Sequence, residues 1–292
     1  PVCTNTSGLS GSTLTVGAAD GPIVCTYTNT RKSATLQLRK QWSNAKVGDT
    51  AALTATGITN SAGAALNSTA DTANDLDSGT AVAVFAGEAA TLGETVDPAA
   101  NYTSTGPVCT GTSGLSGSTL TVGADDTAIV CTYTNTRKSA TLQLLKTWVN
   151  ARVGDAVTVS ATGIVNSAGA QLDAVANVAN ETDPGAVVTV YAGEVATLGE
   201  GSISGSGATY LKSFACTGNS SALAGSVLTV SASDAAIVCT FTNEWLPPAP
   251  PPERPTAKIP VTSPEGLAAM AALLALMGAF ATRRRGGAGR RR

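Results

Sequence analysis

The sequence predicts an all-β protein built from tandem β-sandwiches, followed by a proline-rich linker and a single C-terminal apolar helix. The chain repeats itself with a period of 106 residues, which indicates tandem copies of one folding unit. Short segments of alternating residues are separated by glycine-rich turns, a pattern typical of β-sandwiches. No helical period of useful length appears before residue 260.

The repeat divides the chain into five segments. Residues 1–34 match only the last third of a repeat, so we expect a truncated C-terminal part that packs poorly alone. Two full repeats follow at 35–138 and 139–245. We expect residues 246–258 to form a stiff proline-rich linker, and residues 259–292 combine an apolar run with an arginine tail.

Each full repeat begins with a strand whose alternate residues share one face. These residues are Leu36, Leu38, Lys40 and Trp42 in the first full repeat and Leu142, Leu144, Lys146 and Trp148 in the second. Further strands are predicted at 51–57, 81–85, from 91 onward and 129–135, with counterparts that include 156–163 and 187–191. The last strand of the first full repeat places Ile129, Cys131, Tyr133 and Asn135 on one face.

The composition excludes several kinds of active site. There is no histidine, which removes Ser-His-Asp and Cys-His catalysis and the commonest metal ligand. Without the last ten residues the net charge is −8, so a basic groove for nucleic acid is not expected. We expect no cofactor and no metal. An acidic loop around Asp71, Asp75 and Asp77, partly repeated at Glu181 and Asp183, is read as solvated rather than as a calcium site.

Six cysteines recur in phase as three pairs. The pairs are Cys3 with Cys25, Cys109 with Cys131, and Cys216 with Cys239. This pattern predicts one disulfide in each unit and an oxidising, exported setting. The alternative is six buried thiols in a cytosolic protein. Each disulfide would stabilise its unit by about 3 kcal/mol in the chain-entropy model.

A lysine, a glutamate and an asparagine also recur in phase. They are Lys40, Glu94 and Asn135 in the first full repeat and Lys146, Glu200 and Asn243 in the second. Alternation places each lysine on the inward face, where an unpaired ammonium group is costly. Each asparagine lies on the inward face of the last strand, which can neighbour the first strand of a sandwich.

Such a trio can form an intramolecular amide. Burial lowers the pKa of a lysine and raises that of a glutamate. The neutral amine can then attack the asparagine carboxamide while the glutamate relays protons and ammonia leaves. Two alternatives are a plain buried ion pair with the asparagine as a hydrogen-bond partner, and a lysine that extends to solvent at a sheet edge.

The pattern Leu-Gln-Leu-Leu-Lys146, Tyr191-Ala-Gly-Glu, Thr-Leu-Gly-Glu200 and Cys-Thr-Phe-Thr-Asn243 resembles the collagen-adhesin B-repeat and SpaA-like domains of bacterial surface proteins. The resemblance covers both full repeats and the partial one. It implies Greek-key sandwiches of the prealbumin-like or immunoglobulin-like kind, used as stalk modules in adhesins and pili. It also implies a Lys–Asn isopeptide bond assisted by an acidic residue. The disulfide is an addition to the family pattern and can replace the amide as the staple.

The C-terminus is similar to a tripartite sorting signal with a motif, an apolar helix and an arginine tail. Ile259, Pro260, Ser263 and Gly266 match the IPTL-type signals of exosortases, and the same stretch can be read as a degenerate LPXTG sortase site. The apolar run 267–281 is slightly short for a transmembrane helix. The alternative is a buried helix of a globular domain. The expected partners are a processing protease and, before processing, the membrane.

The sequence therefore predicts an exported, non-enzymatic structural stalk on a bacterial cell surface. A second hypothesis is an adhesin module that uses its sandwich loops to bind a host or neighbour-cell ligand of unknown identity. A third is an envelope hydrolase with paired acidic residues, but no acidic pair recurs at catalytic spacing.

Overall fold

The computed structural model describes residues 1–247 except 7, 113 and 222. The predicted sorting motif at Ile259, Pro260, Ser263 and Gly266 and the apolar run 267–281 lie outside the described residues. Among the described residues, no helix is both long and apolar enough to span a bilayer. The described part is all-β, as the sequence predicts, apart from three single-turn 3-10 helices.

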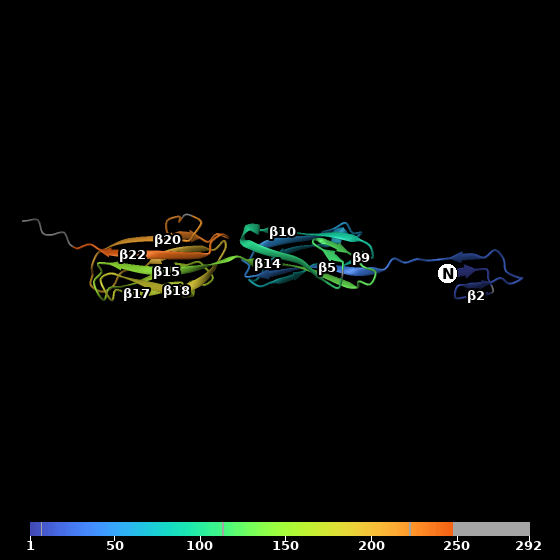
Figure 1. Cartoon of the computed structure of the whole chain (residues 1–292), viewed down its shortest axis with the longest axis horizontal. Helices are drawn as coiled ribbons and strands as arrows, with labels where there is room; N and C mark the ends of the chain where they lie inside the picture. Colours follow the sequence, from blue (N-terminus) through green and yellow to red (C-terminus); the bar gives the residue numbers. More distant parts are fainter. Residues whose placement is uncertain (7, 113, 222, 248–292) are drawn as a thin grey trace, which may run out of the picture. The chain divides into compact units, whose positions relative to one another are not determined.

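The first sandwich is built from ten strands in two sheets (Figure 1). One sheet has the order β12-β13-β10-β6-β7, and the other has the order β11-β14-β5-β8 with β9 also paired to β5. The bounds are β5 (Ser33–Ser43), β6 (Thr50–Thr56), β7 (Ala65–Thr69), β8 (Leu76–Ser78), β9 (Val82–Phe85), β10 (Ala89–Asp97), β11 (Tyr102–Thr110), β12 (Leu115–Ser116), β13 (Thr119–Thr121) and β14 (Ala128–Arg137).

The second sandwich repeats this arrangement with eight strands. Its sheets have the orders β18-β15-β22-β20 and β17-β16-β19-β21. The bounds are β15 (Ser139–Val149), β16 (Ala156–Thr162), β17 (Gln171–Val175), β18 (Glu181–Tyr191), β19 (Val195–Glu200), β20 (Tyr210–Thr217), β21 (Val227–Thr229) and β22 (Ala236–Trp245). The 3-10 turns are Ser61–Gly63, Ala99–Asn101 and Ser167–Gly169.

The first and last strands of each sandwich are parallel neighbours, whereas every other strand pair is antiparallel within the described residues. β14 lies between β11 and β5, and β22 lies between β20 and β15. In this register Asn135 pairs with Trp42, and Asn243 pairs with Trp148. Paired residues on adjacent strands share a face, so each asparagine points into the sandwich beside a tryptophan.

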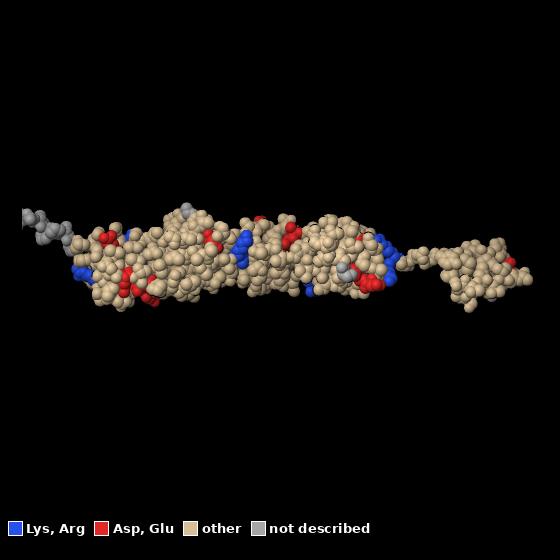
Figure 2. Space-filling view, in the orientation of Figure 1, with Lys and Arg blue, Asp and Glu red and all other residues tan. Residues whose placement is uncertain are grey.

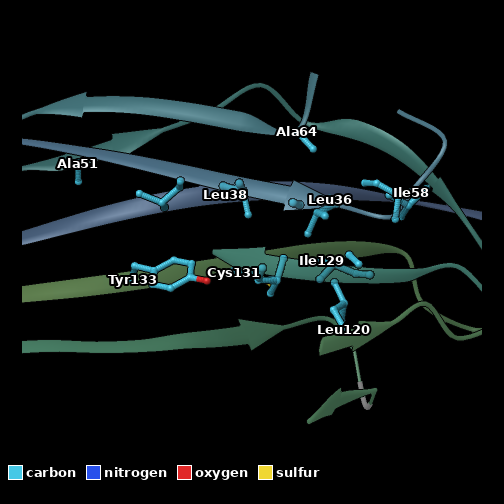
Figure 3. Close-up of a cluster of buried hydrophobic side chains, with 14 of the residues drawn as sticks. Leu36, Leu38, Ala51, Ile58, Ala64, Leu120, Ile129, Cys131 and Tyr133 are labelled. Carbon is cyan, nitrogen blue, oxygen red and sulfur yellow. The ribbon is translucent and has the colours of Figure 1, made fainter. Parts of the chain in front are cut away.

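The core follows from the alternation of residues along the strands. Leu36 and Leu38 on β5 lie beside Ile129 and Cys131 on β14, and all four are buried (Figure 3). Burying one such aliphatic side chain stabilises the fold by about 1.5–3 kcal/mol. Trp42 is fully buried and packs edge-to-face on Tyr102, with ring centroids 5.3 Å apart.

The N-terminal segment lacks this core. Its strands pair as β1 (Val2–Thr4) with β4 (Val24–Thr26) and β2 (Gly8–Ser10) with β3 (Thr13–Thr15). Tyr27 is 72% exposed, whereas its counterpart Tyr133 is 5% exposed. Leu14 and Leu120 differ in the same way. Among the described residues, no strands equivalent to β5 and β6 cover the apolar side chains of this segment.

Some elements differ from the expected ones. The strand predicted at 187–191 begins six residues earlier, because β18 runs Glu181–Tyr191. Its pairing with β15 has a register shift between Gln143 and Leu145 of β15. The equivalent stretch of the first sandwich is split into β8 and β9. β7 and β17 were not predicted, because their short, mostly small or polar sequences give no clear apolar alternation.

Candidate functional site: a buried lysine, glutamate and asparagine

The lysine of each trio lies fully inside its sandwich. Lys40 on β5 and Lys146 on β15 are both 0% exposed. The Lys40 Nζ lies 4.4 Å from the centre of the Trp42 ring, and the Lys146 Nζ lies 4.5 Å from the centre of the Trp148 ring. Each tryptophan pairs in register with the asparagine of the neighbouring strand. Because each ammonium group lies over its tryptophan ring, it is at the same level along the strands as the asparagine. The alternative in which the lysine extends to solvent is wrong.

The glutamate comes from the opposite sheet. Glu94 lies on β10 and points across the interior, with its Oε1 3.1 Å from the Nζ of Lys40. Its side chain is only 7% exposed. Three strands thus contribute to the first trio: β5 and β14 from one sheet and β10 from the other.

The second sandwich brings its trio into direct contact. The Oε1 of Glu200 on β19 lies 3.3 Å from the Nζ of Lys146. The same oxygen accepts a hydrogen bond of 2.8 Å from the Nδ2 of Asn243. One carboxylate oxygen therefore connects the amine and the carboxamide.

Burial sets the electrostatics of the site. It lowers the pKa of Lys40, although the charge of Glu94 opposes this effect. Burial likewise lowers the pKa of Lys146 to about 8, against the opposing charge of Glu200. In the first sandwich burial also raises the pKa of Tyr133 to about 12, and the charge of Glu94 contributes. The two lysines are therefore much readier than an exposed lysine to act as neutral amines.

The carboxamides have unused hydrogen-bonding capacity. Neither the Oδ1 nor the Nδ2 of Asn135 has a hydrogen-bond partner, and the Oδ1 of Asn243 also lacks one. Both asparagines are 0% exposed. Most buried polar atoms in proteins are paired, and an unpaired one costs about 1–3 kcal/mol. Such a cost is consistent with a group held for a reaction rather than for packing.

The cysteines form three disulfides. They are Cys3–Cys25, Cys109–Cys131 and Cys216–Cys239, each with a Cα–Cα distance of 4.0 Å. Each bond joins directly opposed residues of two antiparallel strands. No described cysteine is free.

Three residues near the trios were not among the predicted site residues. Asp77 and Asp183 were predicted in a solvated acidic loop, but they lie half-buried on β8 and β18, directly opposite Lys40 and Lys146. Lys212 lies opposite Asn243 and contacts Glu200. Asp77 and Asp183 recur at the repeat period and stand at alternating positions, so their inward placement could have been predicted. Lys212 has no counterpart in the other repeat and could not.

The acidic loop binds its own backbone. The carboxylate of Asp75 accepts hydrogen bonds from the amide groups of Asp71 and Leu76. In the described part of the chain, no group of three or more candidate metal ligands is present. Asn29, the equivalent of Asn135 in the N-terminal segment, is exposed and has no lysine strand beside it.

No family of known proteins matches the chain in sequence, and neither does any curated protein. Among solved structures, the chain is similar to the major pilin T-13 of Streptococcus pyogenes, with a TM-score of 0.41, 12% identity, and coverage of 75% of this chain and 98% of the pilin. It is also similar to an adhesin of Mobiluncus mulieris that contains intramolecular disulfide, isopeptide and ester cross-links, with a TM-score of 0.29, 12% identity, and coverage of 74% and 100%. Because these scores and identities are low, the chemistry of those proteins does not transfer to this chain.

Proposed function

We propose that the chain is a non-enzymatic structural stalk of a bacterial cell-surface protein, in which each full sandwich is stapled by a disulfide and by a Lys–Asn isopeptide bond. The observation that carries the proposal is the buried lysine that shares one glutamate oxygen with an asparagine, as Lys146 and Asn243 do on Glu200. An ammonium group at 0% exposure is a costly feature for a core to contain. Its recurrence in both sandwiches is accounted for if it is consumed.

The reaction needs no external reagent. The neutral Nζ of Lys146 attacks the Cγ of Asn243, and the Nζ–Cγ bond forms as the Cγ–Nδ2 bond breaks. Glu200 takes a proton from the attacking nitrogen and passes it to Nδ2, which leaves as ammonia. The hydrogen bond from Nδ2 to Glu200 already lies on this proton path. Lys40, Glu94 and Asn135 take the same roles in the first sandwich.

The surface supports a passive role. Charged side chains form small separate groups on the face shown in Figure 2, with no continuous basic stripe. Three disulfides in one chain are typical of exported proteins. Export to the cell surface, processing by an exosortase-like enzyme or a sortase, and transient anchoring through 267–281 complete the proposal. These steps depend on residues outside the described part.

Intact mass spectrometry of the whole chain tests the proposal. Each amide bond removes one ammonia and each disulfide removes two hydrogens, so we expect a loss of two ammonias in addition to six hydrogens. Proteolysis should then yield one branched peptide joining β5 to β14 and another joining β15 to β22. Lys40→Ala and Lys146→Ala should each abolish one ammonia loss, whereas Lys138→Ala should abolish none. A mass that shows only the disulfides would refute the amide and leave the stalk.

A further inference from the structure

The second sandwich contains a lysine that the first one lacks. Lys212 on β20 lies directly opposite Asn243 on β22. Its Nζ is 3.3 Å from the Oε2 of Glu200 and donates a 2.8 Å hydrogen bond to the carbonyl of Gly201. In the first sandwich the residue opposite Asn135 is Ser104. The two candidate sites therefore differ by one positive charge.

Glu200 holds an ammonium group on each of its oxygens. Lys146 contacts Oε1 and Lys212 contacts Oε2. The two lysines differ in burial, because Lys146 is 0% exposed and Lys212 is 42% exposed. Desolvation penalises the charged form of the buried lysine far more than that of the half-exposed one. Lys146 is therefore the lysine that gives up its proton first.

After the buried lysine loses its proton, the glutamate keeps a cation partner in the second sandwich but, in the described part of the chain, not in the first. When Lys146 becomes neutral, Glu200 still forms an ion pair with Lys212. When Lys40 becomes neutral, Glu94 has no other cation within ion-pair distance among the described residues. A buried carboxylate without a partner is costly, so the first sandwich resists the step that the second tolerates.

We infer that Lys212 is a positioning residue that replaces Lys146 as the counter-ion of Glu200 and so leaves Lys146 free to react with Asn243 as a neutral amine. This inference rests on the proposed isopeptide bond. It predicts that the two sandwiches cross-link with different pH dependence, with the second reacting at a lower pH. Lys212 itself does not touch the carbon that is attacked in this scheme. It acts through Glu200.

The charged groups around Lys146 come from three strands besides its own. Glu200 on β19 and Asp183 on β18 favour the charged amine, whereas Lys212 on β20 favours the neutral one. Asn243 on β22 adds a neutral carboxamide. The positive charge of Lys212 therefore acts in the same direction as burial and against both carboxylates.

Lys212 also lines a pocket that reaches Glu200. A pocket of about 220 Å³ is lined by Lys212, Glu200, Leu198, Phe214 and Phe241, among others. The Glu200–Lys212 ion pair therefore contributes polar groups to the wall of this pocket.

The test follows cross-linking over time in the whole chain. Protein purified unfolded and reduced is refolded with a glutathione redox couple across a pH series, quenched in acid, digested, and assayed for the two branched peptides separately. We expect the second-sandwich peptide to form faster than the first at neutral pH. Lys212→Gln should move its pH–rate curve to higher pH, with about a tenfold slower rate below the midpoint for each unit of displacement. Lys212→Arg should restore the wild-type curve.

Ser104→Lys is the complementary variant. It places a lysine opposite Asn135 and should move the pH–rate curve of the first sandwich to lower pH while leaving the second unchanged. This variant keeps the inference testable if Lys212→Gln does not refold, which disulfide mapping of Cys216–Cys239 would reveal. Equal pH–rate curves for both sandwiches that neither substitution moves would overturn the role of Lys212. Absence of both branched peptides in every variant would instead overturn the proposed amide.

Discussion

Cys131 and Asn135 lie on the same inward face of β14, and each is directed at a different neighbouring strand. Cys131 is bonded to Cys109 on β11, whereas Asn135 pairs in register with Trp42 on β5, and the Nζ of Lys40 lies 4.4 Å from the centre of the Trp42 ring. The last strand of the sandwich is thus held by a covalent bond on one side and by the candidate amide on the other. Cys239 and Asn243 repeat the arrangement on β22.

This placement predicts that the two staples protect the same strand. Replacing Cys109 and Cys131 together by Ala should lower the free energy of unfolding of the first sandwich by about 3 kcal/mol. Hydrogen exchange of β14 amides measures the loss, and β22 in the same molecule is the internal control. If β14 exchanges no faster in the double variant, the disulfide does not limit its opening.

Substituting the two buried lysines should lower the free energy of unfolding of their sandwiches by different amounts. In an Asn135→Ala background, where no amide forms, Lys40→Met leaves Glu94 buried without a cation and should destabilise its sandwich by about 3–5 kcal/mol. In an Asn243→Ala background, Lys146→Met should destabilise the second sandwich less, because Glu200 keeps Lys212 as a partner. Denaturant unfolding, monitored by the fluorescence of Trp42 and Trp148 in single-tryptophan backgrounds, separates the two effects. Equal losses would indicate that Lys212 does not balance Glu200 in solution.

The two tryptophans differ in their hydrogen bonds. The Nε1 of Trp42 donates to Ser68 Oγ at 2.8 Å, and Ser68 in turn donates to Asp77 at 2.5 Å. In the second sandwich Ala174 occupies the position of Ser68. There the Nε1 of Trp148 and the Oδ2 of Asp183 make no hydrogen bond of normal geometry.

Exchanging these residues should therefore have opposite effects. Ser68→Ala should destabilise the first sandwich by about 1–3 kcal/mol, because it leaves the Trp42 indole unpaired. Ala174→Ser should stabilise the second by about 1 kcal/mol, because its hydroxyl can bridge Trp148 and Asp183. Thermal unfolding of each variant tests this pair. A loss of stability in Ala174→Ser would mean that the hydroxyl does not fit between the two side chains.

The pKa of Lys146 makes stability depend on pH when the amide cannot form. Burial lowers the pKa of the unreacted Lys146 to about 8 in the folded chain, below its ordinary value of 10.5. In Asn243→Ala, where the lysine stays unreacted, we therefore expect the unfolded chain to bind more protons than the folded chain between these values. The free energy of unfolding should therefore rise with pH through this window. Wild-type protein, whose Lys146 is consumed, should lack this contribution. Lys146→Met in the Asn243→Ala background is the control and should remove the rise; a rise that persists there must come from other groups.

The strand faces, the repeated trio and the cysteine pairs could be predicted from the sequence alone. Alternation in β5 and β15 placed Lys40 and Lys146 on the buried face, because a strand sends successive side chains to opposite sides. The repeat matched each lysine with a glutamate and an asparagine at fixed intervals, and the even, in-phase cysteines indicated one disulfide in each unit. These are properties of a single strand or of the repeat, so they can be read without knowing which strands pair.

Relations between strands depended on the tertiary structure. That Glu94 and Glu200 reach the lysines from the opposite sheet follows from how two layers face each other, which alternation within one strand does not specify. The contact of Lys212 with Glu200 depends on the register of β20 against β22, and no repeat marks it. The second sandwich differs from the first because Lys212 gives Glu200 a second cation and because Ala174 stands where the first sandwich has Ser68. Register and layer packing decide which side chains of distant segments meet, so neither difference could be assigned to the site from the sequence alone.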